Sequence, residues 1–238
     1  MVFAVSTLGC PGLPLPEVRT LLRRHGIGAV QLRCADDEPV HVGLSGRERR
    51  QARRDLEGLT LTGLATYVNL SDGAAGLDAH LDLALDLGAP ALRLMPGNGD
   101  LSPALAEAAA RANGVRLLVE THDAYLRGAD LAQVLAQVPG VGAIWDALHP
   151  WRAGETPAET AAALGPWLAE IQIKDVASRT DLTPLVPGTG AVPLAEVLAL
   201  ARDVPVVLEH EARWHEDAAP IDEAIAGAIE LLRSSARL

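Results

Sequence analysis

The chain has 238 residues, of which 49% are apolar and 21% are charged, and its mean hydropathy is +0.16. This composition excludes disordered and fibrous proteins, and it suits one substantial core better than two ordinary domains. The net charge of −11 counts against nucleic acid as the main partner, because phosphate binding needs clustered basic residues. No apolar run approaches the roughly 18 residues of a transmembrane helix, and no basic segment typical of a signal peptide begins the chain. We therefore expect a cytoplasmic protein with no membrane partner.

Short apolar runs alternate with amphipathic runs rich in alanine and leucine along the whole chain. The expected strands are Val2–Ser6, Ala29–Leu32, Leu59–Tyr67, Ala91–Met95, Arg116–Glu120, Gly142–Asp146, Glu170–Lys174 and Pro205–Glu209. The expected helices are Pro16–Arg24, Gly46–Leu56, Gly73–Leu87, Pro103–Ala112, Leu131–Gln137, Pro157–Trp167, Leu194–Ala201 and Ile221–Ser235. Helix-start signals support the pattern, for example Thr156 before Pro157 with Glu159 three residues on.

Strand–helix alternation implies a parallel sheet. Eight units of about 30 residues each favour a closed (β/α)8 TIM barrel over an open doubly wound sheet. No GxGxxG motif follows the first strand, which disfavours a dinucleotide-binding fold. We expect a single barrel domain over residues 1–238.

Reacting groups in such barrels lie at the carboxyl ends of the strands. Four consecutive expected strands end in polar side chains, and three of them supply the acids Glu120, Asp146 and Glu209. A solvated strand end or a salt bridge explains any one of these acids. Together they would converge on the barrel axis, where mutual repulsion is costly unless a cation neutralises them. A divalent metal ion is the simplest resolution.

The strand ends resemble those of the xylose isomerase-like barrel superfamily. Its members include sugar phosphate isomerases, ketose 3-epimerases, inosose dehydratases and the endonuclease IV enzymes of AP endonuclease family 2. The matching segments, in chain order, are STLGCPGLPL, LLVETHD, IWDALHP, IQIKDV, PGTGAVPL and LEHEARW. Each segment is a weak pattern alone, whereas the ordered set at the expected strand ends is specific for the superfamily.

The resemblance implies Glu120, Asp146, Gln172 and Glu209 as metal ligands. Gln172 stands where the family usually has histidine, and an all-oxygen ligand set favours Mn²⁺ or Mg²⁺ over Zn²⁺ or Co²⁺. The resemblance also implies Glu120 and Glu209 as the catalytic acid–base pair, and a substrate contact for His149.

Four further residues are candidates for substrate binding. Lys174, the only lysine in the chain, lies on the same side of its strand as Gln172 by alternation. His122 follows Glu120 by two residues, and Ser6 ends the first strand. Arg213 could hold a carboxylate or phosphate substituent, although exposure to solvent explains it equally well.

The resemblance implies a metal-dependent isomerase or epimerase of sugars or sugar phosphates, which acts by proton abstraction next to a carbonyl through an enediolate. Alternatives are a dehydratase or lyase with the same chemistry, and a degenerate barrel that binds a small molecule without turnover. A repair endonuclease is disfavoured by the acidic charge and the few histidines. Members of the superfamily often form homodimers, so a homodimer is possible.

The run RERRQARR, residues 47–54, is the only basic cluster in the sequence. It lies on an expected helix and is interleaved with Glu48. Two explanations remain open, namely a solvated outer face of the helix and a patch that binds an anionic ligand.

Overall fold

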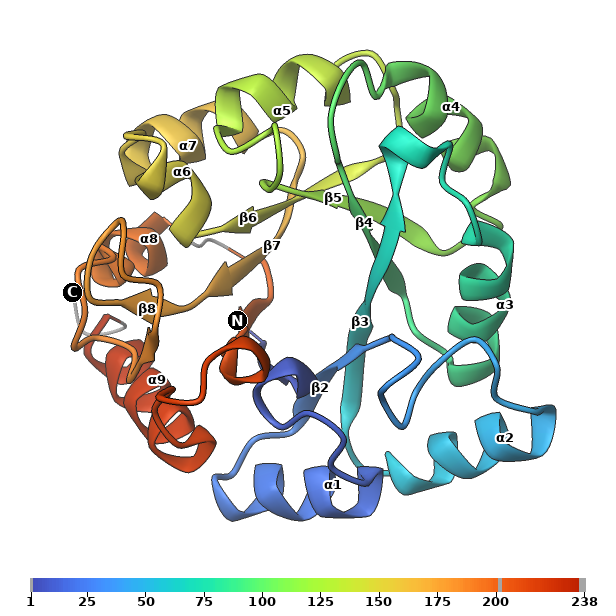
Figure 1. Cartoon of the computed structure of the whole chain (residues 1–238), viewed down its shortest axis with the longest axis horizontal. Helices are drawn as coiled ribbons and strands as arrows, with labels where there is room; N and C mark the ends of the chain where they lie inside the picture. Colours follow the sequence, from blue (N-terminus) through green and yellow to red (C-terminus); the bar gives the residue numbers. More distant parts are fainter. Residues whose placement is uncertain (1, 201–202, 236–238) are drawn as a thin grey trace.

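The computed structural model describes residues 2–200 and 203–235. Eight parallel strands close into a barrel in the order β1-β10-β7-β6-β5-β4-β3-β2, which confirms the expected (β/α)8 fold (Figure 1). The barrel strands are β1 Phe3–Ser6, β2 Ala29–Arg33, β3 Thr60–Asn69, β4 Ala91–Met95, β5 Arg116–Glu120, β6 Gly142–Asp146, β7 Leu168–Ile173 and β10 Val206–Leu208. The first and last strands pair directly, with Phe3 opposite Val206.

Helices surround the barrel, as Figure 1 shows. They are α1 Leu15–Arg24, α2 Gly46–Asp55, α3 Leu77–Leu87, α4 Ser102–Arg111, α5 Gly128–Leu135, α6 Leu148–Arg152, α7 Pro157–Leu164, α8 Leu194–Leu200 and α9 Ile221–Ser235. Short 3-10 turns cover residues 7–9, 70–72 and 212–214. Capping boxes start α2 at Ser45 and α7 at Thr156, where the cap hydroxyl and a glutamate three residues on satisfy free backbone N–H groups.

Several element boundaries differ from the expected ones. Helix α3 begins at Leu77 rather than Gly73, because Gly73 and Gly76 have φ of 67° and 77° and interrupt the helix. Helix α6 was not expected, nor was the two-stranded sheet of β8 Asp175–Val176 and β9 Pro184–Leu185. The expected end of a helix at Ala201 and the ends of the expected domain, residues 1 and 236–238, lie outside the described residues. Within the described residues, no helix is long and apolar enough to cross a membrane.

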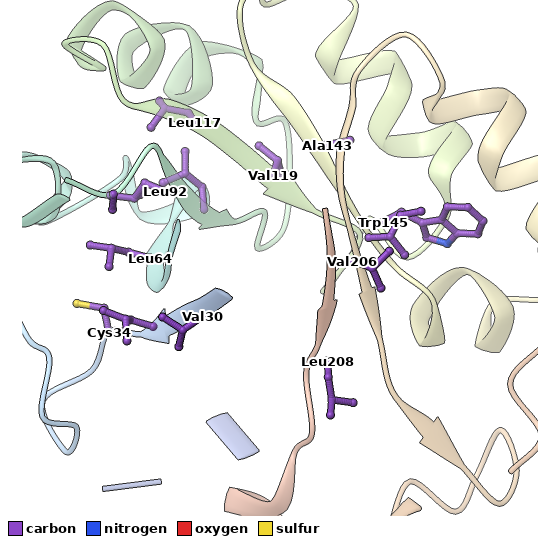
Figure 2. Packing of buried hydrophobic residues seen from close by; sticks show 14 of the residues in the cluster. Val30, Cys34, Leu64, Leu92, Leu117, Val119, Ala143, Trp145, Val206 and Leu208 are labelled. Atoms are coloured by element: carbon purple, nitrogen blue, oxygen red, sulfur yellow. The ribbon is translucent and has the colours of Figure 1, made fainter. Parts of the chain in front are cut away.

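Strand alternation separates two environments. Side chains that point outward, such as Leu92, Leu117 and Val119, join the main apolar cluster with the helices (Figure 2). Residues between them point into the barrel, where Leu118 and Ile144 form a small separate cluster with Ala169. Because Glu120 and Asp146 follow Leu118 and Ile144 by two residues, their side chains share this inner face. The barrel interior therefore holds an apolar cluster on β5, β6 and β7, and its acids Glu120 and Asp146 stand at the carboxyl ends of β5 and β6.

Candidate active site

Three acids from three strand ends meet inside the barrel. Glu120 ends β5, Asp146 ends β6, and Glu209 directly follows β10. All three are buried, at 2% exposure or less, and one carboxylate oxygen of each lies within 4.8 Å of the other two. The structure therefore brings together the acids on which the sequence-based hypothesis depends.

Arg93, in the middle of β4, bonds to two of these acids, Glu120 on the neighbouring strand and Glu209 across the barrel. Its Nη1 lies 2.8 Å from Glu120 Oε2 and 2.8 Å from Glu209 Oε1, and Nη2 donates to the Thr66 carbonyl at 3.3 Å. No role was predicted for Arg93 from the sequence. The sequence feature that could have indicated a role is the position of Arg93 as the single charged residue in the apolar strand ALRLM. A buried arginine is costly unless acidic partners lie close to it.

Lys174 follows β7 and supplies the second buried cation. Its Nζ lies 2.8 Å from Asp146 Oδ2 and 2.5 Å from Glu209 Oε2, and it also contacts Glu211. The structure thus places this candidate substrate-binding residue within the acid cluster. Glu211, to which the sequence analysis assigned no role, joins the cluster through the same ammonium group.

The cluster holds more negative than positive charge. Within the part of the chain that the structure describes, the four carboxylates of Glu120, Asp146, Glu209 and Glu211 form ion pairs with two permanent cations, Arg93 and Lys174. Burial raises the pKa of Glu120 to about 7 against the opposing effect of Arg93, and Glu209 adds to the rise. Burial would also raise the pKa of Asp146, but Lys174 reverses this and holds it below the ordinary value. With all six groups ionised the cluster carries a charge of −2, which a divalent cation would balance.

A second polar group lies beside the acids in the barrel interior. Gln172 pairs in register with Asp146 on the neighbouring strand, and its Nε2 lies 3.3 Å from Glu170 Oε1. Gln31 of β2 donates to the same oxygen at 2.7 Å, and burial raises the pKa of Glu170 to about 7. Gln172 Oε1 is buried and has no hydrogen-bond partner among the described residues. An unpartnered buried oxygen beside Asp146 suits the role of metal ligand expected for Gln172.

Two histidines face one another near the acids. The ring centroids of His122 and His149 lie 4.5 Å apart in an edge-to-face arrangement, and His149 Nε2 lies 3.7 Å from Asp146 Oδ2. Burial lowers the pKa of His149 to about 4, so its imidazole is neutral at neutral pH. Neither ring nitrogen of His149 has a hydrogen-bond partner within residues 2–200 and 203–235. His149 can therefore donate to a bound molecule through one nitrogen and accept through the other.

The two remaining candidates have other contacts. Ser6 is buried, and its Oγ accepts a bond of 3.4 Å from the Leu8 amide. Arg213 forms an ion pair with Asp37 and is partly exposed. No contact of either residue with Glu120, Asp146 or Glu209 is found among the described residues, so their substrate-binding roles stay predictions.

Tyr67 links the loop after β2 to the acid cluster. Its ring lies 5.2 Å from the Arg33 guanidinium carbon and 5.5 Å from that of Arg93. Arg33 also bonds Glu38 Oε1 at 2.5 Å, and it holds the loop that begins at Cys34. Arg33 and Tyr67 stand in no sequence motif, so no role was predicted for either.

Comparison with known proteins agrees with this architecture. The family model described as xylose isomerase-like TIM barrel matches residues 20–235, and the chain belongs to that family. A comparison with curated proteins found no match. The resemblance recognised from the strand ends is thereby confirmed.

Similar solved structures share the fold over nearly their whole length. A D-psicose 3-epimerase with D-tagatose from Clostridium cellulolyticum H10 is 14% identical, with a TM-score of 0.77 and 99% of each chain covered. The IolI protein with a bound zinc atom is 14% identical, with a TM-score of 0.78 and 99% of each chain covered. The probable 3-DHS dehydratase AsbF from Bacillus anthracis is 15% identical, with a TM-score of 0.76, and the match covers 98% of this chain and 99% of that one. At these identities the likeness concerns the fold alone.

Proposed function

We propose that this protein is a metal-dependent isomerase or epimerase of sugars or sugar phosphates. The observation that carries the proposal is the convergence of Glu120, Asp146 and Glu209, with one oxygen of each within 4.8 Å of the others. The epimerase with D-tagatose among the similar folds supports a carbohydrate substrate, and the zinc-bound IolI protein supports a metal ion as cofactor.

The donors present fit a divalent ion. Glu120, Asp146, Glu209 and Gln172 offer oxygen only, which suits Mn²⁺ or Mg²⁺ better than Zn²⁺ or Co²⁺. The excess of carboxylates over cations in the cluster and the unpartnered Gln172 Oε1 agree with a bound divalent cation. A divalent ion bound there would act as a Lewis acid toward a substrate carbonyl and make the neighbouring C–H group more acidic.

Glu120 and Glu209 are the proposed acid–base pair. One carboxylate removes the proton next to the carbonyl, and the other returns a proton to the substrate. Arg93 bonds one oxygen of each acid, so it fixes their separation and their orientation across the barrel. Its role is therefore to position the pair.

Lys174 and His149 are proposed to bind substrate oxygens. Lys174 stabilises developing negative charge, because its ammonium group lies among the acids and stays protonated. His149 presents two unpartnered nitrogens and orients a substrate hydroxyl. His122 packs against His149 and limits how far that ring can turn.

The His122–His149 pair also favours a second candidate, a dehydratase or lyase. After the same initial proton abstraction, Glu120, whose pKa is raised to about 7 by burial, could protonate a leaving hydroxyl group that the neutral His149 imidazole orients through a hydrogen bond. The similar fold of a probable 3-DHS dehydratase supports keeping this candidate. The two reactions differ in product, since the lyase releases water and the epimerase does not.

The test combines metal content with proton exchange. Protein purified without chelator or metal-binding tag is analysed by elemental mass spectrometry, beside Glu209→Gln and the exposed control Glu216→Gln. The same proteins are incubated in deuterium oxide with ketopentoses, ketohexoses and their phosphates. We expect about one metal ion per chain and deuterium next to the carbonyl of one substrate, with both lost only in Glu209→Gln.

The outcomes separate the candidates. Release of water from a substrate that also takes up deuterium would show that the protein is a dehydratase or lyase rather than an epimerase. Equal metal content in wild type and Glu209→Gln would show that Glu209 is not a metal ligand. No metal and no deuterium incorporation in wild type would overturn the enzymatic proposal and favour a barrel that binds without turnover.

A further inference from the structure

A surface cavity of about 720 Å³ lies on the far side of the barrel from the acid cluster. Its lining comes from α2, from the segment that leads into β3, and from the end of α3, which lie side by side in Figure 1. Leu59 immediately precedes β3, and Gly88 lies shortly before β4. The cavity therefore opens at the amino ends of the strands, whereas the acids stand at the carboxyl ends.

Arginines form one wall of this cavity. Arg50, Arg53 and Arg54 of α2 are all exposed and line it, and Glu57 is the only acid in the lining. None of the three arginines forms an ion pair with an acid in the described part of the chain. Arg49, on the same helix, does pair with Asp86 of α3 at 2.9 Å, so acids are within reach of this helix. The cavity thus concentrates positive charge on a protein whose net charge is −11.

Leucines form the floor of the cavity. Leu56 and Leu87 are buried, while Leu59 and Leu61 are half-buried and leave apolar surface toward the opening. An inorganic ion would gain nothing from this floor. A ligand with an apolar body would cover it and remove this apolar surface from water, which favours binding.

We propose that this cavity binds an organic anion that combines a phosphate, sulfonate or carboxylate group with an aryl or alkyl body. The guanidinium groups of Arg50 and Arg53 bind the anionic group through paired N–H donors, and the leucine floor packs against the apolar body. The volume lies within the 300–1,000 Å³ range typical of sites for small molecules. Because the cavity and the acid cluster are at opposite ends of the barrel, this site is separate from the proposed active site.

The test uses the fluorescent aryl sulfonate 8-anilinonaphthalene-1-sulfonate as probe. Its binding to the wild-type chain is compared with the double variant Arg50→Ser/Arg53→Ser and the matched control Arg47→Ser/Arg233→Ser. The control removes the same charge from two exposed arginines outside the cavity. We expect saturable binding to wild type and control, and an affinity at least about 10-fold weaker in the cavity variant, because charged hydrogen bonds are lost.

Competition tests the chemistry of the ligand. Phenyl phosphate should displace the probe from wild type at concentrations where inorganic phosphate does not, because only the former covers the leucine floor. Glu209→Gln should bind the probe as wild type does, which would place the site away from the acids. Equal probe affinity in wild type and the cavity variant would overturn the proposal. Equal competition by phenyl phosphate and inorganic phosphate would show that the leucine floor does not contribute to binding. Circular dichroism verifies that each variant is folded.

Discussion

Lys174 and Glu209 form an ion pair inside the barrel, with Nζ and Oε2 2.5 Å apart and both side chains at most 3% exposed. The same ammonium group lies 2.8 Å from Asp146 Oδ2. Two ions removed from water in this way lose hydration, and the loss is repaid only while both charges remain. Asp146 therefore depends on Lys174 whenever no metal ion is bound, while Glu209 is shared between Lys174 and Arg93.

Lys174→Met should destabilise the metal-free protein by about 3–5 kcal/mol, because it leaves Asp146 buried without its cation and Glu209 with Arg93 alone. Addition of Mn²⁺ should restore part of this loss, since a divalent ion would balance the same carboxylates. Urea unfolding with EDTA and with MnCl₂ measures both effects. Arg111→Met is the control, because it breaks an exposed pair with Asp78 and should cost less than about 1 kcal/mol. A similarly small loss in Lys174→Met would show that the buried pair is not needed for stability.

Gln172→His should strengthen Zn²⁺ binding by about 10-fold or more and change Mn²⁺ binding much less. The reason is that imidazole suits zinc, whereas amide and carboxylate oxygens suit Mn²⁺ and Mg²⁺. Competition with a chromophoric chelator measures both affinities. Gln137→His, at an exposed position after α5, is the control and should leave both unchanged. If Gln172→His leaves zinc affinity unaltered, Gln172 does not lie at a metal site.

The sequence was sufficient to predict the barrel and the acids at its carboxyl ends. Glu120 and Asp146 end apolar runs, and alternation along the strands places both side chains inside. The start of α3 could not be predicted, because the sequence pattern did not show that Gly73 and Gly76 adopt left-handed conformations. Helix α6 was missed because it is short and forms where the Asp146 carboxylate accepts a bond from the Leu148 amide at 2.7 Å.

Contacts across the barrel could not be predicted in the same way. Arg93 lies on β4 and reaches Glu209 after β10, although three strands separate β4 from β10 around the sheet. Gln31 on β2 likewise reaches Glu170 on β7. Such pairs depend on the width of the closed barrel and on side-chain length, and a strand pattern contains neither quantity. Their only sequence signal is a polar residue inside an apolar strand, which must have a partner when buried.

Cys10 and Cys34 should react slowly with a thiol reagent in the folded protein. Burial raises the pKa of each thiol to about 12, and Glu38 and Asp36 respectively add to the rise, so little thiolate forms at pH 8. We expect both to react with 5,5′-dithiobis(2-nitrobenzoic acid) at least about 100-fold more slowly than free cysteine, and at normal rates in urea. Fast reaction of either thiol in native buffer would show that its segment opens readily.

Glu159→Gln should lower the midpoint of thermal unfolding at pH 7, by no more than about 2 °C. Glu159 Oε2 accepts bonds of 2.8 Å from the Thr156 amide and 2.7 Å from its hydroxyl, and these bonds lower the pKa of the carboxyl group below 4.5. A folded-state pKa below the unfolded one contributes stability above the unfolded pKa, and this is lost as pH falls through the folded value.

The difference between wild type and Glu159→Gln should therefore close as pH falls through the lowered folded-state pKa of Glu159, because the carboxyl group then becomes protonated in the folded protein too. Calorimetry from pH 7 to pH 3 measures it. Glu230→Gln, an exposed change in α9, is the control and should follow wild type throughout. A gap that stays constant over this pH range would mean that the charge of Glu159 does not stabilise the start of α7, and that the cap acts through hydrogen bonding alone.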